Sequence, residues 1–188
     1  MSDAFFFLSL PSNFKNSNLL KNINNYDRKC IEAVCNRLGP WWHNSVFGIV
    51  DARGEIKATT AIKTGGYDNV NDYVKAAVEA LQPIIETVGG IEKIKAMGIG
   101  APNGNFYKGT IEYAPNLPWA HTCVVPLADL FSKALGGLPV ALTNDANAAA
   151  LGEMTYGAAR GLKNFIDITL GTGVGSGIVI DGKMVYGC

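Results

Sequence analysis

The chain has 188 residues and carries 16 lysines and arginines against 16 aspartates and glutamates, so its formal net charge is zero. This length suits one globular domain, or one and a fraction. A balanced charge gives no basic field, which argues against a nucleic-acid partner or an anionic membrane. No apolar run reaches the ~20 residues that cross a bilayer, and the stretch from Ala4 to Leu10 lacks the basic start of a signal peptide. We therefore expect a cytoplasmic protein with no nucleic-acid or membrane partner.

The four cysteines, at positions 30, 35, 123 and 188, show no paired spacing, and the chain has only two histidines. Neither a disulfide framework nor a zinc site is predicted from this pattern. We assign no metal-ligating residue.

Residues 1–44 differ in composition from the rest of the chain. Asparagine is frequent between positions 13 and 25, and the segment from Cys30 to His43 follows neither a helical nor a strand period. We expect no packed element here and treat 1–44 as an aberrant N-terminal segment.

From Ser45 onward, hydrophobic periodicity and turn residues predict regular elements. The predicted strands span 46–50, 55–63, 96–101, 140–143, 165–170, 177–180 and 183–186, and the predicted helices span 70–88, 126–135 and 146–159. Asn69 or Asn71 caps the first helix, Pro83 should kink or break it, and Asp181-Gly182 fits a type I′ turn. This order is that of an α/β fold. We expect a first lobe over 45–148 that lacks its first strand, and the start of a second lobe over 149–188.

The most glycine-rich segment runs from Leu170 to Gly177 and lies between two predicted strands. A dinucleotide-binding loop or a Walker loop would be followed by a helix, so both are excluded. A glycine turn between strands can still bind phosphate through its N–H groups, and Thr169 and Thr172 would add hydroxyl donors. The alternative is a tight hairpin without a ligand.

Polar residues follow the predicted strand at 140–143. Asn144 and Asp145 lie where this strand gives way to a helix, which is where open α/β sheets bind ligands. The helix dipole favours a carboxylate there, so a purely capping role for Asp145 is the alternative. Asn116 lies between two prolines, and its amide offers the donor and acceptor that suit a sugar hydroxyl. Trp119, close to it, is expected to pack in the core.

Four motifs occur in order along the chain: GIGAPNG (98–104), APNLPW (114–119), TNDANAAALGE (143–153) and LGTGVGSGIVIDG (170–182). Together they resemble the ROK-family sugar kinases, which include bacterial glucokinases. The resemblance implies an actin-like ATPase (ribonuclease H-like) fold, with one nearly complete lobe and the start of a second. It further implies ATP-dependent phosphorylation of a hexose, with glucose as the leading substrate, in a cleft between the lobes.

The resemblance also implies roles for individual residues. Asp145 matches the catalytic base, and Asn116 and Asn144 match sugar-binding positions together with Asp145. The second phosphate loop is matched by four residues: Thr169, Gly171, Thr172 and Gly173. Mg²⁺ is implied as the ion that bridges the ATP phosphates. Members of the family commonly form homodimers, so a homodimer is the assembly to test.

The chain departs from the family in two places. The first phosphate loop, D-x-G-G-T, is absent before the strand at 46–50, and the family's G-E-x-G-H sugar segment and zinc site would lie beyond Cys188. Codons for residues 36–43, read one base later, can encode Ile-Gly-Leu-Asp-Leu-Gly-Gly-Thr. We hypothesise that residues from about 30 to 43 are a frameshifted reading of this loop. We therefore expect poor folding and little or no kinase activity from this polypeptide alone.

Two other functions stay open. One is a non-catalytic ROK-family fragment that binds sugar, and the other is a sugar-responsive transcriptional repressor with an N-terminal helix-turn-helix. Residues 1–44 show no pair of amphipathic helices and no basic face, which counts against the repressor. Sugar-dependent release of ADP would separate the kinase from both.

Overall fold

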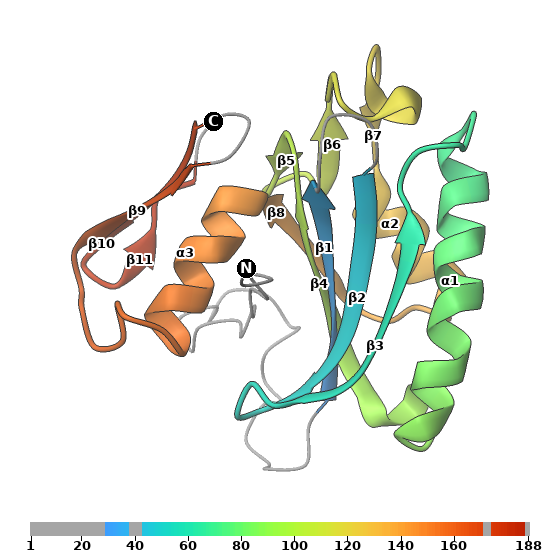
Figure 1. Ribbon diagram of the computed structural model, residues 1–188, viewed down its shortest axis with the longest axis horizontal. Coiled ribbons are helices and arrows are strands. Elements are labelled where there is room, and N and C mark those ends of the chain that lie inside the picture. Colours follow the sequence, from blue (N-terminus) through green and yellow to red (C-terminus); the bar gives the residue numbers. More distant parts are fainter. Residues whose placement is uncertain (1–28, 38–42, 171–173, 187–188) are drawn as a thin grey trace.

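The computed structural model describes residues 29–37, 43–170 and 174–186 (Figure 1). Its largest sheet has five strands in the order β3-β2-β1-β4-β8. β1, β2 and β3 pair antiparallel, and β1, β4 and β8 pair parallel. The strands are β1 (Lys29–Arg37), β2 (His43–Asp51), β3 (Ile56–Lys63), β4 (Ile94–Ala101) and β8 (Val140–Asn144).

β1 is the central strand of this sheet, so the expectation that no packed element precedes Ser45 is wrong. It pairs with β2 from Lys29–Asp51 to Arg37–His43 and with β4 on its other side. Backbone pairing on both sides can impose a strand on a segment whose side chains show no clean alternation. The large sheet therefore contains the strand before Ser45 that was expected to be lacking. Residues 38–42 lie outside the described residues. The frameshift hypothesis concerns the nucleotide sequence, so it stays a prediction.

Helices α1 (Val70–Thr87) and α2 (Leu127–Ala134) cover one side of the sheet (Figure 1). Asn69 caps α1 by accepting a hydrogen bond from the N–H of Asp72 at 3.0 Å. Pro83 does not break α1, because it lies on the exposed side, where water can solvate the carbonyl group that it leaves unpaired. The core between helices and sheet includes Phe47, Ile49, Tyr73, Leu81, Met97 and Phe131. Within the described ranges, no helix is long and apolar enough to cross a membrane.

Helix α3 (Asp145–Thr155) lies between the large sheet and a three-stranded sheet (Figure 1). The small sheet has the order β11-β10-β9, with β9 (Phe165–Leu170), β10 (Val174–Ile180) and β11 (Lys183–Met184). The predicted helix was too long, since α3 ends at Thr155, and β10 starts earlier than predicted. Asp181 and Gly182 have φ values of 52° and 72°, which agrees with the predicted turn.

Several short elements were not predicted. A third sheet contains β5 (Gly104–Asn105), β6 (Thr110–Glu112) and β7 (Val124–Val125), and two 3₁₀ turns span Ile91–Lys93 and Pro118–Ala120. Elements of two or three residues are too short to show a period in the sequence. In Figure 1 this third sheet stands near the upper end of the large sheet, where β4 and β8 end.

Candidate functional site

Asn144 and Asp145 lie at the junction of β8 and α3. β8 pairs with β4 in parallel, and this places Asn144 beside Ala101 at the carboxyl ends of both strands. Asn144 is the N-cap residue, and Asp145 is the first residue of the helix, one position earlier than predicted. The N–H of Ala146 donates to Oδ1 of Asn144 at 3.0 Å and to Oδ1 of Asp145 at 2.9 Å. Both side chains are thus held at the start of α3, and that of Asp145 is exposed.

The first turn of α3 packs tightly against β4. A Cβ added at Gly100 would lie 2.9 Å from the Cβ of Ala148 and 3.7 Å from the Cα of Asp145. Only glycine lets the helix approach the strand this closely. Gly100 of the GIGAPNG motif therefore fixes the position of the backbone that carries Asp145.

The small sheet brings Thr169 to the same end of α3. Thr169 pairs with Gly175, and a Cβ added at Gly175 would lie 2.5 Å from Oγ1 of Thr169 and 2.9 Å from the Cβ of Ala146. Thr169 and Ala146, the residue that follows Asp145, thus both border Gly175. Gly171, Thr172 and Gly173 follow Thr169 in the sequence but lie outside the described residues.

The loop after β4 crosses the end of β8. A Cβ at Gly104 would collide with the backbone carbonyl of Thr143, so this position requires glycine. Asn103 has a φ of 53°, and its side-chain amide donates to the carbonyl oxygens of Glu112 at 3.0 Å and Tyr113 at 3.2 Å. The Asn-Gly pair is the sequence signal for this left-handed turn.

Glu112 organises the hairpin of β5 and β6. Its Oε1 accepts hydrogen bonds from Oγ1 of Thr110 at 2.9 Å, from Nζ of Lys108 at 3.2 Å and from Nδ2 of Asn105 at 3.2 Å. The Thr110 hydroxyl first, and then the Lys108 ammonium, lower the pKa of Glu112. This network keeps the hairpin ordered beside the end of β8. The sequence gives no periodic signal for it.

Asn116 is exposed in the loop between β6 and β7. Four backbone hydrogen bonds, among them Leu117 N–H to the Ala114 carbonyl at 3.1 Å, close this loop on itself. Trp119 is buried, as predicted, and stacks on Tyr73. The loop therefore holds Asn116 on a fixed backbone. No described contact joins Asn116 to Asn144 or Asp145.

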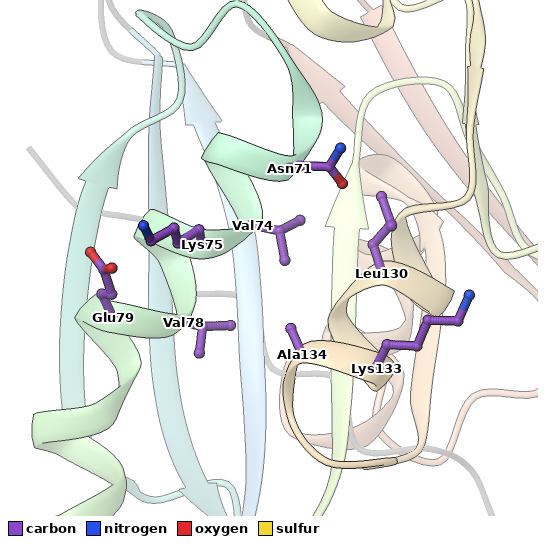
Figure 2. Close-up of a pocket in the computed structure, with 8 residues that line it drawn as sticks. All are labelled: Asn71, Val74, Lys75, Val78, Glu79, Leu130, Lys133 and Ala134. Carbon is purple, nitrogen blue, oxygen red and sulfur yellow. The ribbon is translucent and has the colours of Figure 1, made fainter.

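A groove between α1 and α2 is separate from this site (Figure 2). Val74 and Val78 of α1 face Leu130 and Ala134 of α2 across it. Both helices lie on one side of the large sheet and α3 on the other (Figure 1). The groove is thus remote from Asp145. Among the described residues, no three histidine, cysteine or acidic side chains gather as a metal site.

Comparison with known proteins shows where these motifs belong. The model of the ROK family matches residues 42–188. The chain belongs to the ROK family. The glucokinase of Streptomyces coelicolor is 39% identical to it over 141 residues, which are 74% of this chain and 41% of the relative. The xylose repressor of Caldicellulosiruptor bescii is 41% identical over 96 residues, which are 50% of this chain and 23% of the repressor.

A solved structure shares the fold. The ROK-family glucokinase of Streptomyces griseus, in complex with glucose and AMPPNP, matches with a TM-score of 0.68 and 35% identity over 85% of this chain and 47% of that chain. The expected actin-like ATPase fold is thereby confirmed. This ROK-family chain spans about half the length of the relatives it matches.

Proposed function

We propose that this chain provides the hexose-binding lobe and the catalytic base, Asp145, of an ATP-dependent hexose kinase, with glucose as the leading substrate. The observation that carries the proposal is the exposed carboxylate at the start of α3, next to Ala146, where β10 and Thr169 approach the first lobe. The likeness to glucokinases supports sugar phosphorylation as the reaction class.

Asp145 would act on the sugar hydroxyl that attacks ATP. A bond forms between the hydroxyl oxygen and the γ-phosphorus, the bond from that phosphorus to ADP breaks, and the hydroxyl proton passes to the carboxylate. Phosphoryl transfer depends mostly on positioning and charge stabilisation. The cap that fixes Asp145 at the helix start therefore contributes directly, because it orients the base before the sugar binds.

The amides of Asn144 and Asn116 would select the sugar. Each presents both a donor and an acceptor, which matches a hydroxyl group that also donates and accepts. Asn144 is fixed by its capping bond, and Asn116 stands on the closed loop after β6. In this proposal, Asn144 orients the hydroxyl that reacts, and Asn116 binds a hydroxyl elsewhere on the ring.

The residues near the start of β10 suit a phosphate group. Thr169 offers a hydroxyl, and the space at Gly175 is so tight that the strand lies directly against the first turn of α3. Thr169, together with the segment 171–173, would hold the ATP phosphates. Mg²⁺, when bound with ATP, neutralises phosphate charge.

The polypeptide as it stands should be a poor enzyme. Loss of one preorganised hydrogen-bond donor typically costs ~10²–10³ in rate. The first phosphate loop, which this sequence lacks before the strand at 46–50, would offer several such donors. We expect no sugar-dependent release of ADP above background from this chain alone. Clear turnover would contradict this expectation.

The test is to sequence the locus, express the frame-restored, full-length product and assay it on a panel of hexoses with ATP and Mg²⁺. Asp145→Asn should lower kcat by about 10²–10⁴, the usual range for general base catalysis. Asp129→Asn, an exposed acid on α2, is the matched control and should leave kcat unchanged. Undiminished phosphorylation by Asp145→Asn would refute the role of the carboxylate.

A sugar-responsive repressor is the second candidate, favoured by the likeness to the xylose repressor. It predicts binding to operator DNA that sugar releases, and no release of ADP. Retention of DNA by the frame-restored product, without kinase activity, would replace the kinase proposal.

A further inference from the structure

Three aromatic side chains from two different sheets are in contact. Phe106 stacks on Tyr186, with ring centroids 3.9 Å apart and ring planes inclined by 5°. Tyr107 meets both rings edge-on, with its centroid 5.6 Å from that of Phe106 and 6.0 Å from that of Tyr186. Edge-to-face contacts at such distances are favourable. We call this cluster of Phe106, Tyr107 and Tyr186 the aromatic clasp.

Phe106 lies in the loop that joins β5 to β6, and this loop has a fixed backbone. Oδ1 of Asn105 accepts a hydrogen bond from the N–H of Tyr107 at 3.1 Å. The N–H of Gly109 donates to the carbonyl of Asn105 at 3.0 Å, and the carbonyl of Gly109 accepts from the N–H of Ala128 at 3.1 Å. Because Ala128 belongs to α2, the loop that carries Phe106 is attached to a helix that covers the large sheet.

Tyr186 is carried by the small sheet. It follows Val185, whose N–H donates to the carbonyl of Ile178 at 2.8 Å and thereby extends the pairing of β11 with β10. The Tyr186 side chain is half-buried. Burial first, and then the nearby Tyr107 side chain, raise the pKa of Tyr186 to about 12. The ring is thus held at a paired strand end and is enclosed by the clasp.

The clasp joins two segments that both pack near the start of α3. Gly104, at the base of the β5–β6 hairpin, lies against the backbone of Thr143. Gly177 of β10 lies against Ala146, since a Cβ added there would be 2.9 Å from the Ala146 carbonyl oxygen. Thr143 and Ala146 stand just before and just after the pair that contains Asp145. The aromatic contact therefore connects the neighbours of the candidate base.

Without the clasp, α3 is the main connection between the small and the large sheet (Figure 1). On one side its Ala148 packs on Gly100 of β4, and on the other its Ala150 packs on Gly177 of β10. Contacts between alanine and glycine are flat, and packed elements can slide along each other by small shear movements. The helix alone therefore leaves the small sheet some freedom to shift.

We propose that Phe106 and Tyr186 are a positioning pair, whose stack fixes the small sheet against the β5–β6 hairpin beside Asp145. The sheet then has two anchors, α3 along its inner face and the stack at the end of β11. Two separate anchors prevent the sliding that one flat contact permits. Tyr107, which is 71% exposed, supports the stack through its edge contacts.

This role deepens the proposed function and rests on it for its chemistry. The proposed sugar-binding amides belong to the loop after β6 and to the end of β8, whereas Thr169, proposed to hold phosphate, belongs to β9. The separation between the sugar hydroxyl and the γ-phosphorus then depends on where the small sheet stands. A misplacement of about 1 Å can lower a rate by about 10²-fold. Loss of the stack should therefore impair the use of ATP and leave sugar binding intact.

The first test measures the connection itself, in this chain and without sugar or ATP. Phe106→Ala and Tyr186→Ala should each speed hydrogen exchange in β10 and β11 by about two- to tenfold, the usual worth of an aromatic pair. Exchange in β1, β2 and β4 should not change. The double variant should exchange no faster than either single variant, because both remove the same contact. Phe106→Tyr keeps a ring and should keep exchange slow.

Tyr113→Ala is the matched control. Tyr113 is an exposed aromatic residue at the end of the same hairpin, and no described residue makes a ring contact with it. Its replacement should leave exchange in β10 and β11 unchanged. If Phe106→Ala does not fold, as judged by circular dichroism, Tyr186→Ala decides, because Tyr186 lies outside the hairpin.

The second test uses the frame-restored, full-length product. Phe106→Ala should raise the KM for ATP by about two- to tenfold, the worth of one hydrogen bond to the phosphate. The KM for the sugar should stay unchanged, and Phe106→Tyr should restore the KM for ATP. A residue that served folding alone would lower the amount of active enzyme, and hence kcat, without moving the KM for ATP.

Four results would overturn the proposal: unchanged exchange of β10 and β11 in both alanine variants, additive effects in the double variant, faster exchange in every sheet alike, or an unchanged KM for ATP in Phe106→Ala. The third would reduce the pair to a contribution to overall stability. A frame-restored product that phosphorylates no hexose would refute the proposed function instead. The exchange experiment would then still decide whether the stack holds the small sheet.

Discussion

Trp119 stacks on Tyr73, with ring centroids 4.9 Å apart and ring planes inclined by 22°. Tyr73 belongs to α1 and is almost fully buried, whereas Trp119 belongs to the loop that carries Asn116. The contact therefore ties a loop with a proposed sugar-binding amide to the core of the first lobe. The proposed role of Asn116 therefore predicts that mutations in this loop separate a loss of stability from a loss of sugar binding.

Trp119→Ala should destabilise the chain by about 3–5 kcal/mol, the usual cost of removing a buried aromatic side chain. Trp119→Phe should cost much less, because it keeps a ring on Tyr73 and removes a buried indole N–H for which the described part of the chain offers no hydrogen-bond partner. Urea unfolding followed by circular dichroism measures both. Asn116→Ala is the contrasting variant: its stability should change by less than about 0.5 kcal/mol, while sugar affinity falls. Equal losses for Trp119→Ala and Trp119→Phe would contradict the packing argument.

Gly177→Ala should destabilise the chain by about 1–3 kcal/mol, because the added methyl group would overlap the Cβ of Ala150 and force β10 away from α3. Gly65→Ala is the matched control, since nothing lies within 4 Å of its added Cβ. That variant should be neutral or stabilise by up to about 1 kcal/mol through the unfolded state. Thermal unfolding of the two variants side by side is the measurement. A stable Gly177→Ala variant would show that α3 and β10 are not in close contact.

Thr143→Val should be neutral or stabilise by up to about 1 kcal/mol. The Thr143 hydroxyl is buried and has no hydrogen-bond partner among the described residues, so valine of the same shape removes an unsatisfied group. Ser45→Ala is the opposite case, because the Ser45 hydroxyl bonds Oγ1 of Thr64 at 2.8 Å and the hydroxyl of Tyr73 at 2.9 Å. It should cost about 1–3 kcal/mol. Equal destabilisation by the two variants in urea unfolding would mean that Thr143 has a partner after all, such as a bound water.

The elements that sequence reasoning found are those with long, clean periods. α1 was located within one residue at each end, because its apolar stripe recurs over eighteen residues and Asn69 caps it. β9 was located without error, because the aliphatic residues Ile166, Ile168 and Leu170 occupy every second position. β1 was missed, because its strand conformation follows from pairing with β2 and β4 and not from its own side-chain pattern.

Some features of the candidate site could be predicted from the sequence and others could not. Asn144 and Asp145 could be placed from the sequence, because a strand followed by a cap and a helix is a local signal. The proximity of Thr169 to Ala146 could not, since it depends on glycine contacts between segments far apart in the chain. The hydrogen-bond network around Glu112 could not be predicted either, because its side chains do not follow the spacing of a helix or a strand.

Asp167 should make stability depend on pH in the acid range. Burial first, and then the nearby Glu153 carboxylate, raise the pKa of Asp167 above its ordinary value of 3.8. An acid whose pKa is higher in the folded state favours folding while it is protonated, and this contribution is lost as pH rises through the folded pKa. Asp167→Asn should therefore stabilise the chain at pH 7, by at most about 0.5 kcal/mol because the group is largely exposed to solvent screening. The gain should vanish near pH 3, where the Asp167 carboxyl group is protonated and both side chains are neutral.

Unfolding midpoints at pH 3, 5 and 7 measure the effect, with Asp181→Asn, in the turn between β10 and β11, as control. A gain that is the same at all three pH values would show that the carboxylate charge is not its cause.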